Sequence, residues 1–230
     1  MQETQLSQSN EDYLKNIWLL GEQIGKAVGV RALARRMRLS PSTVSEAMKK
    51  LTEHGYVDHH RYAGITLTET GRKIAIQMAR KHRLIETYLV RQLNYGWDEV
   101  HDEAEALEHA VSNQFVARID EILGYPETDP HGDPIPNADG KISHIPLKLL
   151  SEIDKIGVVK IQRVSDEDSE VLAYLAEAKL LPGTRCEIKS ISQTLGSITL
   201  TPYTNTHPRQ PASDLQITFP VAKHIWVAAD

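Results

Sequence analysis

Hydrophobic residues recur at helical spacing along the first half of the chain and in short strand-like runs along the second half. The helical period predicts helices over residues 10–22, 30–37, 68–93 and 97–123. Asn10 is a suitable N-cap for the first of them, because its side chain can accept a hydrogen bond from the free backbone N–H groups of a helix start. The first half is therefore expected to be mainly helical.

A further helix is predicted between the second and third of these segments. Ser40 is its expected N-cap, Pro41 suits its first position, and Gly55 ends it. Val44, Ala47, Met48 and Leu51 recur at i, i+3, i+4 and i+7 and should face a core. Two strands, at 56–60 and 65–68, follow with a turn between them. This order of elements predicts a winged helix-turn-helix.

The second half changes in texture after a Pro-, Gly- and Asp-rich segment at 125–140, which is a linker or an ordered loop. Short β-type runs occur at 158–164, 184–191, 197–203, 215–219 and 225–227. One helix, at 169–179, is predicted among them. These runs indicate a small, strongly bent β-barrel domain.

Charge divides the chain more sharply than its net value of −5 suggests. Between Lys26 and Arg91 there are 14 basic and 5 acidic residues, whereas from Gln92 onward there are 11 basic and 22 acidic residues. A basic segment that holds a winged helix-turn-helix predicts binding to a polyanion such as DNA. The acidic remainder favours a part of the protein that binds cations.

Length and composition exclude several classes of protein. A chain of 230 residues is long enough for two or three domains. No apolar run approaches the roughly 20 residues that span a bilayer, and the polar segment 1–10 has no signal-peptide pattern. Cys186 is the single cysteine, so internal disulfides are excluded. These features predict a cytoplasmic protein.

The segment from His101 to His109 carries the strongest signal of metal chemistry. On a helix at about 100° per residue, one side would hold His101, Glu105, Glu108 and His109, beside an apolar stripe that leaves them half covered. From Gln92 to Ala117 there are six acidic residues and no lysine or arginine. Such carboxylates repel one another unless a cation binds, so a divalent ion is expected. A solvated face with i,i+4 salt bridges is the alternative.

The helix that begins at Pro41 is the expected recognition helix, because such helices present their N-terminal residues to base edges. Candidates for DNA contact are Arg31, Arg35, Arg36, Ser40, Ser42, Thr43, Ser45, Glu46, Lys49, Lys50, Arg61 and Tyr62, of which the basic residues would bind phosphates. Glu46 either accepts from a cytosine amino group or pairs with Lys50. A winged helix used for protein contacts is the alternative.

Several motifs together resemble the diphtheria toxin repressor (DtxR) family of metal-activated transcriptional repressors. They are Glu11-Asp12-Tyr13-Leu14, Ser42-Thr43-Val44-Ser45, Arg80-Lys81-His82-Arg83-Leu84 with Glu86, Val100-His101-Asp102-Glu103, and Pro130-His131-Gly132-Asp133-Pro134-Ile135-Pro136. The resemblance covers nearly the whole chain. It implies a winged helix-turn-helix domain at 1–73, a helical metal-binding and dimerisation domain at 74–145, and an SH3-like (FeoA-type) β-barrel at 146–230, so the fold class is mainly α with a β domain.

Carried over residue by residue, the resemblance implies a primary metal site of Asp12, Glu105, Glu108 and His109, with His82 close by. Iron-type members have Met and Cys where this chain has Asp12 and Glu105, so the chain resembles the manganese-type branch. Oxygen and nitrogen ligands without thiolate suit Mn²⁺, with Fe²⁺ a near competitor, and Zn²⁺, Co²⁺ and Cd²⁺ are expected to bind in vitro. Lys15 stands where some manganese-type members carry a further acid for a paired-metal site.

A second, structural metal site is also implied. Its candidate ligands are Glu86, His101, Asp129, His131, Asp166 and Asp168, with His82 and Glu86 spaced i,i+4 on one helix. An ordinary helix pair and an ordinary loop are the alternatives for these residues. The barrel could bind a peptide, brace the metal site or aid dimer packing, and the resemblance favours bracing.

A metal at the primary site is expected to fix the DNA-binding heads relative to the two-fold axis of a homodimer. The two recognition helices would then meet the half-sites of a palindromic operator, about 34 Å apart. Repression of metal-homeostasis genes is the expected outcome. A lysine or arginine side chain that filled the Glu108–His109 pocket of a metal-loaded structure would contradict this hypothesis.

Three other classes of function are the alternatives to a metal-activated repressor. No enzyme is predicted, because the sequence has no nucleophile elbow or phosphate-binding glycine loop, and a di-iron bundle needs Glu-x-x-His on two helices. A metal-independent winged-helix regulator that senses an organic ligand is the main alternative, and it predicts that EDTA leaves operator binding unchanged. A pure interaction scaffold predicts no salt-dependent DNA binding.

Overall fold

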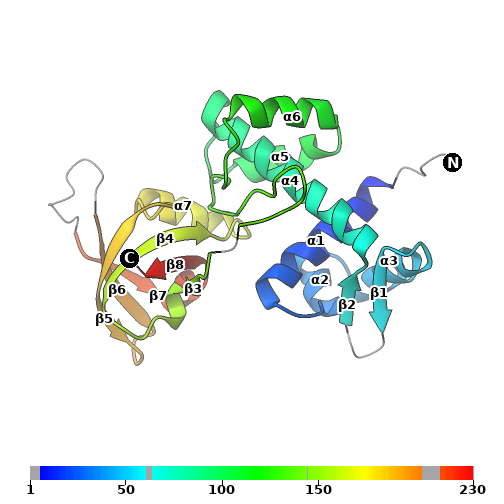
Figure 1. Cartoon of the computed structure of the whole chain (residues 1–230). Helices are drawn as coiled ribbons and strands as arrows, with labels where there is room; N and C mark the ends of the chain where they lie inside the picture. The colour runs from blue at the N-terminus through cyan, green and yellow to red at the C-terminus, as the bar shows by residue number, and fades with distance from the viewer. Residues whose placement is uncertain (1–5, 61–63, 144, 204–212, 230) are drawn as a thin grey trace. The chain divides into compact units, whose positions relative to one another are not determined.

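The computed structural model of the chain describes residues 6–60, 64–143, 145–203 and 213–229. The chain, drawn in Figure 1, divides into two compact units. Each unit has its own hydrophobic core. The first unit comprises Met1–His82, Glu108–Val111 and Pro136–Ile142. The second unit comprises Arg83–Leu107, Ser112–Ile135 and Ser143–Asp230.

The first unit contains a helix-turn-helix and a two-stranded wing. Its elements are α1 (Gln8–Ile24), α2 (Val30–Arg36), α3 (Pro41–Glu53), β1 (Val57–His60), β2 (Gly64–Leu67) and the first half of α4 (Glu69–Leu93). The strands pair antiparallel, with Val57 opposite Leu67 and His60 opposite Gly64. The order of elements confirms the predicted winged helix-turn-helix.

Serine side chains set the starts of two of these helices. The hydroxyl of Ser40 accepts a hydrogen bond from the backbone N–H of Thr43 at 3.1 Å, and Pro41 is the first residue of α3, as predicted. The prediction for α1 was wrong: its N-cap is Ser7, which accepts from the backbone N–H of Asn10. Ser7 satisfies one of the free N–H groups of the helix start, so α1 begins earlier than predicted.

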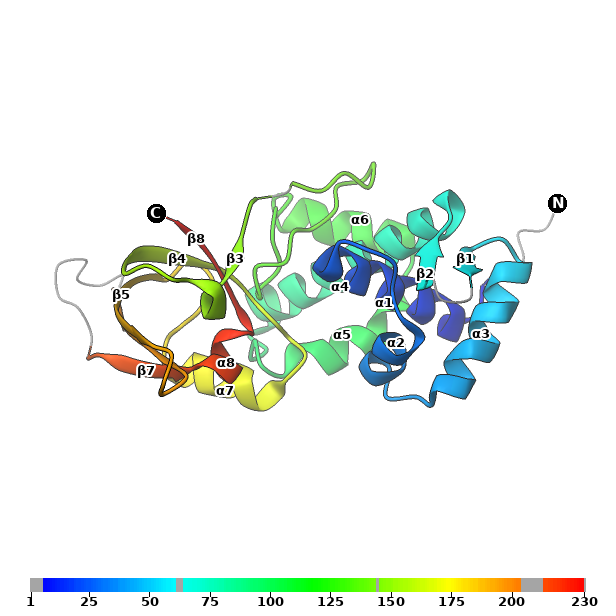
Figure 2. The ribbon, with the colours of Figure 1, turned by 90° about the horizontal axis from the view of Figure 1, so that it is seen from below.

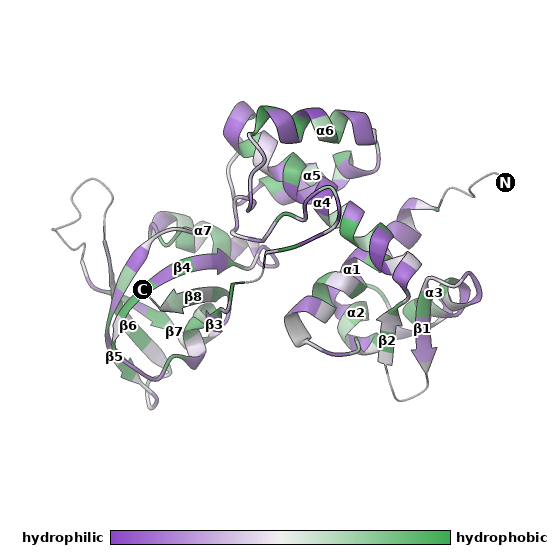
Figure 3. Ribbon diagram, viewed as in Figure 1, coloured by the Kyte–Doolittle hydropathy of each residue, from purple (hydrophilic) through white to green (hydrophobic). Residues whose placement is uncertain are grey.

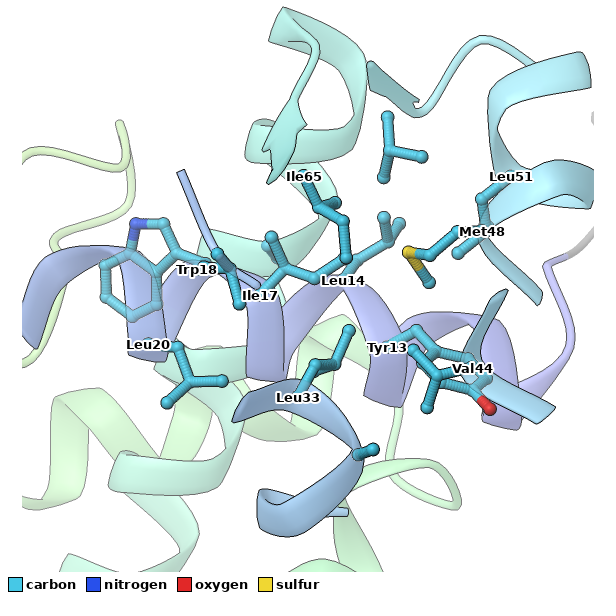
Figure 4. Packing of buried hydrophobic residues seen from close by; sticks show 14 of the residues in the cluster. Tyr13, Leu14, Ile17, Trp18, Leu20, Leu33, Val44, Met48, Leu51 and Ile65 are labelled. Carbon is cyan, nitrogen blue, oxygen red and sulfur yellow. The ribbon is translucent and has the colours of Figure 1, made fainter. Parts of the chain in front are cut away.

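Apolar side chains of α1 pack against the helix-turn-helix and the wing. Figure 4 shows Leu14, Ile17 and Trp18 of α1, Leu33 of α2, Val44, Met48 and Leu51 of α3, and Ile65 of β2 in this core. Each of these side chains is at most 4% exposed. Because the apolar stripe fixes the rotation of α1, it also fixes the directions in which the polar residues of α1 point.

Residues 97–123 form two helices, not the single helix that was predicted. α5 spans Val100–Glu108 and α6 spans Asn113–Ile122. The hydroxyl of Ser112 accepts from the backbone N–H of Phe115 and caps α6, and this local bond replaces the continuation of a single helix. His109 therefore lies in the turn after α5, and Glu108 is fully buried where half covering was expected.

The second unit carries a six-stranded antiparallel sheet with the strand order β3-β8-β4-β5-β6-β7. The strands are β3 (Lys148–Leu149), β4 (Gly157–Val164), β5 (Arg185–Ser192), β6 (Ser197–Pro202), β7 (Leu215–Thr218) and β8 (Ile225–Ala229). Register shifts in β4 and β5 bend the sheet, as Figure 2 shows. The β domain is confirmed, although β3 was missed, because two residues are too short to show a period.

Three short helical segments accompany the sheet. They are η1 (Leu150–Glu152), α7 (Ser169–Glu177) and α8 (Phe219–Ala222). α7 places Leu172 and Leu175 in the hydrophobic core of the sheet. The helix predicted at 169–179 is therefore present and ends two residues earlier.

The segment 127–135 is an ordered loop that docks on β4. The backbone N–H of Ile135 donates to the carbonyl of Glu127 at 2.8 Å, and the N–H of Val164 in β4 donates to the carbonyl of His131 at 2.8 Å. Gly132 adopts a φ of +88°. A Cβ at this position would clash with the carbonyl oxygen of Gln162. Only glycine therefore lets the loop approach β4 so closely.

We predict that Gly132→Ala lowers the stability of the protein more than Gly183→Ala does. The two glycines have φ values of +88° and +94°, so alanine at either costs about 1–2 kcal/mol in backbone strain. A Cβ at Gly183 meets nothing within 4 Å, whereas the clash at Gly132 should cost roughly 1–3 kcal/mol more. Urea unfolding of the two variants measures the difference, and equal losses would contradict the close docking of the loop.

Candidate metal centres and DNA-binding face

The first cluster of metal-ligating residues joins α1 to the turn after α5. Ligand atoms of Asp12, Glu108 and His109 lie within 4.8 Å of one another. Asp12 comes from α1, Glu108 is the last residue of α5, and His109 follows it. All three belong to the first unit. Two carboxylates and an imidazole at this spacing fit one divalent ion that prefers oxygen and nitrogen ligands.

Each of the two ring nitrogens of His109 contacts a carboxylate. Its Nδ1 lies 2.9 Å from Oε2 of Glu11, and its Nε2 lies 2.8 Å from Oδ1 of Asp12. Burial alone would lower the pKa of His109, but the hydrogen bonds with Asp12 and Glu11 outweigh it and raise this pKa. When Nδ1–H donates to Glu11, the lone pair of Nε2 is available to a metal ion, as in many histidine–metal sites.

Glu108 is the buried centre of this cluster. Its side chain is 0% exposed, its Oε2 lies 2.7 Å from Nδ1 of His82, and its Oε1 lies 2.5 Å from Nζ of Lys15. Burial would raise the pKa of Glu108, but the contacts with His82 and Lys15 outweigh it and lower this pKa. The lowered pKa keeps this carboxylate ionised, and an ionised carboxylate can bind a further cation.

Sequence reasoning missed the roles of Glu11 and Lys15. Glu11 entered only as part of a motif, because a residue adjacent to a ligand on a helix points about 100° away from it and gives no periodic signal. Lys15 is 2% exposed, and its ammonium pairs with Oε1 of Glu108 at 2.5 Å. Sequence analysis placed Lys15 near the metal site, one turn after Asp12, but did not predict its pairing with Glu108.

Glu105 belongs to the second unit, unlike Asp12, Glu108 and His109. It lies four residues after His101 on α5, and its Oε1 is 3.8 Å from Nε2 of His101. The carboxylate is about two-fifths exposed. Its place in the primary site stays a prediction.

The second cluster is centred on Glu86, a residue of α4 that is 1% exposed. Ligand atoms of Glu86, Asp129 and His131 lie within 4.8 Å of one another, and those of Glu86, His101 and Asp166 do as well. Nδ1 of His101 lies 3.3 Å from Oε1 of Glu86 and 3.4 Å from Oδ2 of Asp166. The structure thus brings together five of the six residues that were predicted for the second site.

The charged groups of this cluster strongly shift one another's pKa values. Burial opposes protonation of His101, but its hydrogen bonds with Asp166 and Glu86 prevail and raise its pKa to about 10. The pKa of Asp166 is lowered despite burial, because His101 donates to it. Burial, together with Asp133 and Glu86, raises the pKa of Asp129 to about 8. Carboxylates this close and this deeply buried favour the arrival of a cation.

His131 is the clearest metal-ligand candidate of the second cluster. Its Nε2 lies 2.6 Å from the carbonyl oxygen of Trp97, which only accepts, so Nε2 carries the proton. Its Nδ1 lies 3.7 Å from Oε2 of Glu86 and has no hydrogen-bond partner within the described part of the chain. Burial opposes protonation, yet Glu86 raises the pKa of His131 to about 10. A bound metal ion would satisfy this buried nitrogen.

Backbone and side-chain bonds hold the loop that carries His131. Oδ1 of Asp129 accepts from the backbone N–H groups of His131 and Asp133, at 2.9 Å each. Arg83 donates to the carboxylate of Asp133 at 3.0 Å. These bonds fix the position of His131 in the loop.

Asp168 was predicted as a possible ligand of the second site, but it is the N-cap of α7. Its Oδ1 accepts from the backbone N–H groups of Glu170 at 3.0 Å and Val171 at 3.2 Å. The first backbone N–H groups of α7 have no partner within the helix, and the carboxylate of Asp168 satisfies them as its N-cap. Asp166, two residues earlier, is the residue that faces the cluster.

The predicted DNA-contact residues of α3 form an exposed face. Ser42, Thr43, Ser45, Glu46, Lys49 and Lys50 are all exposed, as are Arg31 and Arg35 of α2. Ser40 caps α3, and Glu46 pairs with Lys50 at 3.1 Å, which is one of the two roles considered for it. Arg36 is half-buried and donates to Asn16 at 2.7 Å. Arg61 and Tyr62 lie outside the described residues.

Three descriptions of known families match successive parts of the chain. "Iron dependent repressor, N-terminal DNA binding domain" matches residues 5–65 and "Iron dependent repressor, metal binding and dimerisation domain" matches residues 68–137. "FeoA domain" matches residues 148–229. The iron-dependent repressor IdeR of Mycobacterium leprae is 30% identical over 200 residues, which are 80% of this chain and 85% of that protein.

This chain belongs to the diphtheria toxin repressor family. Among solved structures, a manganese-dependent transcriptional repressor in complex with manganese is 41% identical, with a TM-score of 0.88 over 96% of this chain and 99% of that chain. The manganese regulator SloR is 34% identical, with a TM-score of 0.77 over 96% and 98%. The predicted family is confirmed, the likeness to these structures supports its manganese-type branch, and the chain is a metal-dependent, DNA-binding transcriptional repressor.

Two further properties of the repressor concern enzymatic activity and the crossing of a membrane. Its relatives are transcriptional repressors, which are not enzymes. In the described parts of the repressor, no helix has both the length and the apolar character that crossing a membrane requires.

We predict that Glu11→Gln weakens metal binding to the repressor by about 10- to 100-fold, because a carboxylate that orients a histidine ligand also raises its basicity. Isothermal titration with Mn²⁺ measures the change. Glu22→Gln, an exposed glutamate of the same helix, is the matched control and should leave the affinity unchanged. Equal affinities of the two variants would show that Glu11 does not orient His109.

Proposed function

We propose that Mn²⁺ activates this repressor, and that the activated homodimer binds a palindromic operator of metal-homeostasis genes in the cytoplasm. The observation that carries the proposal is the convergence of Asp12, Glu108 and His109 from α1 and from the turn after α5. Their donors are carboxylate oxygens and an imidazole nitrogen, which suit Mn²⁺. Two manganese-dependent relatives of high structural similarity add support.

Other ions compete for the same donors. Fe²⁺ prefers nearly the same ligands, and an Fe²⁺-responsive repressor is the second candidate, because the curated relative is iron-dependent. Zn²⁺, Co²⁺ and Cd²⁺ should also bind in vitro, since the affinity of such ligands for Zn²⁺ exceeds that for Mn²⁺. Selectivity for Mn²⁺ would then come from coordination geometry and the metal supply.

The primary site would act as a clasp between the DNA-binding helices and the turn 108–111. A divalent ion supplies the positive charge that lets Asp12 and Glu108 stay ionised side by side. Asp12 would hold α1 to this turn, while Glu11 keeps the imidazole of His109 oriented. The backbone carbonyl of Asp12 accepts from Asn16, whose side chain accepts from Arg36 of α2. This chain of bonds couples the clasp to the helix-turn-helix.

The second site would brace the loop 127–135 and the β domain against α4. Glu86, His101, Asp129, His131 and Asp166 are the proposed ligands. Glu86 would serve both groups of ligands from its central position. We propose a structural role for this site, since its residues come from α4, α5, the loop and the segment after β4.

Exposed apolar side chains support a dimer. Phe115 and Ile122 of α6 are 48% and 62% exposed, and Tyr125 after α6 is 69% exposed. Figure 3 shows hydrophobic residues among hydrophilic ones along α6. This helix lies within the part that matches the dimerisation domain of the family. A dimer would bury these side chains and present two α3 helices to half-sites about 34 Å apart.

We predict that Asp12→Ala lowers operator affinity in Mn²⁺ by at least about tenfold while the dimer persists, because the clasp loses its ligand on α1. A mobility shift on genomic fragments, with Mn²⁺, Fe²⁺, Zn²⁺ and chelator in parallel, measures this affinity. Asp102→Ala, an exposed acid of α5, is the control. Metal-dependent binding that survives in Asp12→Ala would defeat the proposal, and wild-type binding that survives chelator would favour the organic-ligand regulator.

We predict that the affinity for Mn²⁺ rises with pH up to the raised pKa of His109. The raised pKa of His109 means that this imidazole holds a proton in the metal-free protein at low pH, and a metal ion must displace it. Each displaced proton should change the affinity by about tenfold per pH unit below that pKa. Titration calorimetry in two buffers of different ionisation enthalpy counts the released protons. An affinity that does not vary with pH would contradict the role of His109.

A further inference from the structure

The exposed side of α3 carries one acid near the start of the helix. Val44, Met48 and Leu51 are at most 1% exposed and fix the rotation of α3 against the core (Figure 4). At about 100° per residue, Ser42 and Glu46 lie on the opposite, exposed side, one turn apart. In a helix-turn-helix, the N-terminal residues of the recognition helix contact base edges in the major groove. Glu46 is therefore in position to contact a base.

The polar groups at this end of α3 are hydrogen-bond acceptors and not cations. The hydroxyl of Ser45 donates to the carbonyl of Pro41 at 2.8 Å, so a base can meet only its lone pairs. The carboxylate of Glu46, when ionised, accepts hydrogen bonds and donates none. The first lysine of α3 is Lys49, three residues further on. Guanine presents two acceptors and is read by arginine or lysine, so it does not complement this end of the helix.

Among the four bases, cytosine complements a carboxylate best. In the major groove cytosine presents its N4 amino group as a donor, whereas adenine has the acceptor N7 beside its N6 amino group. Guanine and thymine present the acceptors O6 and O4, which repel a carboxylate. A glutamine, by contrast, donates to N7 of adenine and accepts from N6. The chemistry of Glu46 thus selects cytosine, and a change to glutamine should select adenine.

The ion pair of Glu46 with Lys50 is compatible with a base contact. Nζ of Lys50 lies 3.1 Å from Oε1 of Glu46, and the two side chains are 65% and 72% exposed. A pair this exposed adds little to the stability of a protein. On DNA its effect is larger, because the phosphates repel an unpaired carboxylate and Lys50 cancels that charge. A carboxylate has about four lone-pair sites, so Lys50 leaves acceptor capacity for a base.

We propose that Glu46 determines specificity at one base pair of each half-site. There it accepts from the N4 amino group of cytosine, while Lys50 neutralises its charge. This inference rests on the operator binding proposed above and names the base that α3 selects. The salt bridge and the base contact, the two roles expected for Glu46, then occur together.

Selection from random duplex DNA tests the base preference without a known operator. Bound sequences are determined for the wild type and for Glu46→Gln, both loaded with Mn²⁺. The wild type should enrich cytosine at one position of each half-site, and Glu46→Gln should enrich adenine there with the other positions unchanged. Glu69→Gln is the matched control, because Glu69 forms an exposed i,i+4 pair with Lys73 on α4. This control should select the same sequence as the wild type.

Mobility shifts on the selected sequence measure the size of the effect. Replacement of that C·G pair by T·A should weaken the binding of the wild type at least about fivefold. The same replacement should change the binding of Glu46→Gln by less than about twofold, because an amide can accept from cytosine and donate to thymine.

A double-mutant cycle tests the part of Lys50. Lys50→Met should weaken binding to the selected sequence at least about twofold more in the wild type than in Glu46→Gln, because glutamine has no charge to neutralise. Equal losses in the two backgrounds would show that Lys50 binds DNA independently and would overturn its role beside Glu46.

The outcomes separate this inference from operator binding itself. If the wild type and Glu46→Gln enrich the same bases, or the position that changes holds a base other than cytosine in the wild type, the role of Glu46 is overturned. Enrichment of palindromic sites in Mn²⁺ would still support the proposed function. If the wild type enriches no sequence in Mn²⁺, both the operator binding and the role of Glu46 fail.

Discussion

A buried carboxylate is the constraint on which the first unit depends. Glu108 is 0% exposed, and a charge without water is stable only where cations and hydrogen-bond donors surround it. The protein meets this need with Lys15 and His82, and ligand atoms of Asp12 and His109 lie within 4.8 Å of the same carboxylate. Because α1 supplies both Asp12 and Lys15, the charge of Glu108 is tied to the position of a helix that packs in the core of the DNA-binding unit.

The second unit meets the same constraint differently. Glu86 is also buried, but imidazoles and further carboxylates face it where Glu108 has a lysine. The positions of Asp129 and His131 depend on a loop that approaches β4 only because Gly132 has no side chain. His101, His131 and Arg83 supply the positive charge in this cluster, because the acids raise the pKa of both histidines and Arg83 lies 3.7 Å from Asp129. The two clusters therefore balance their buried carboxylates with different cations.

One helix, α1, connects the proposed metal centre to the helix-turn-helix. Asp12 and Asn16 lie on one face of α1, and Asn16 is bonded both to the backbone of Asp12 and to Arg36 of α2. α1 also packs through Leu14 and Ile17 against α2 and α3. A change in the position of α1 would thus move the recognition helix as one body with it. Coupling of this kind needs only one helix with a polar and an apolar face.

The sequence alone determined the periodic and local features of this protein. Hydrophobic spacing and turn residues predicted the winged helix-turn-helix and the β domain, and Ser40-Pro41 predicted the start of α3. The motifs predicted the family and the candidate ligands. The Ser112 cap that divides the acidic helix and the Asp168 cap of α7 are local features that hydrophobic spacing does not reveal. Only the tertiary structure decided that Lys15 and Glu11 lie beside Glu108 and His109. Residues 93 or more positions apart meet there, and a local pattern carries no information about such contacts.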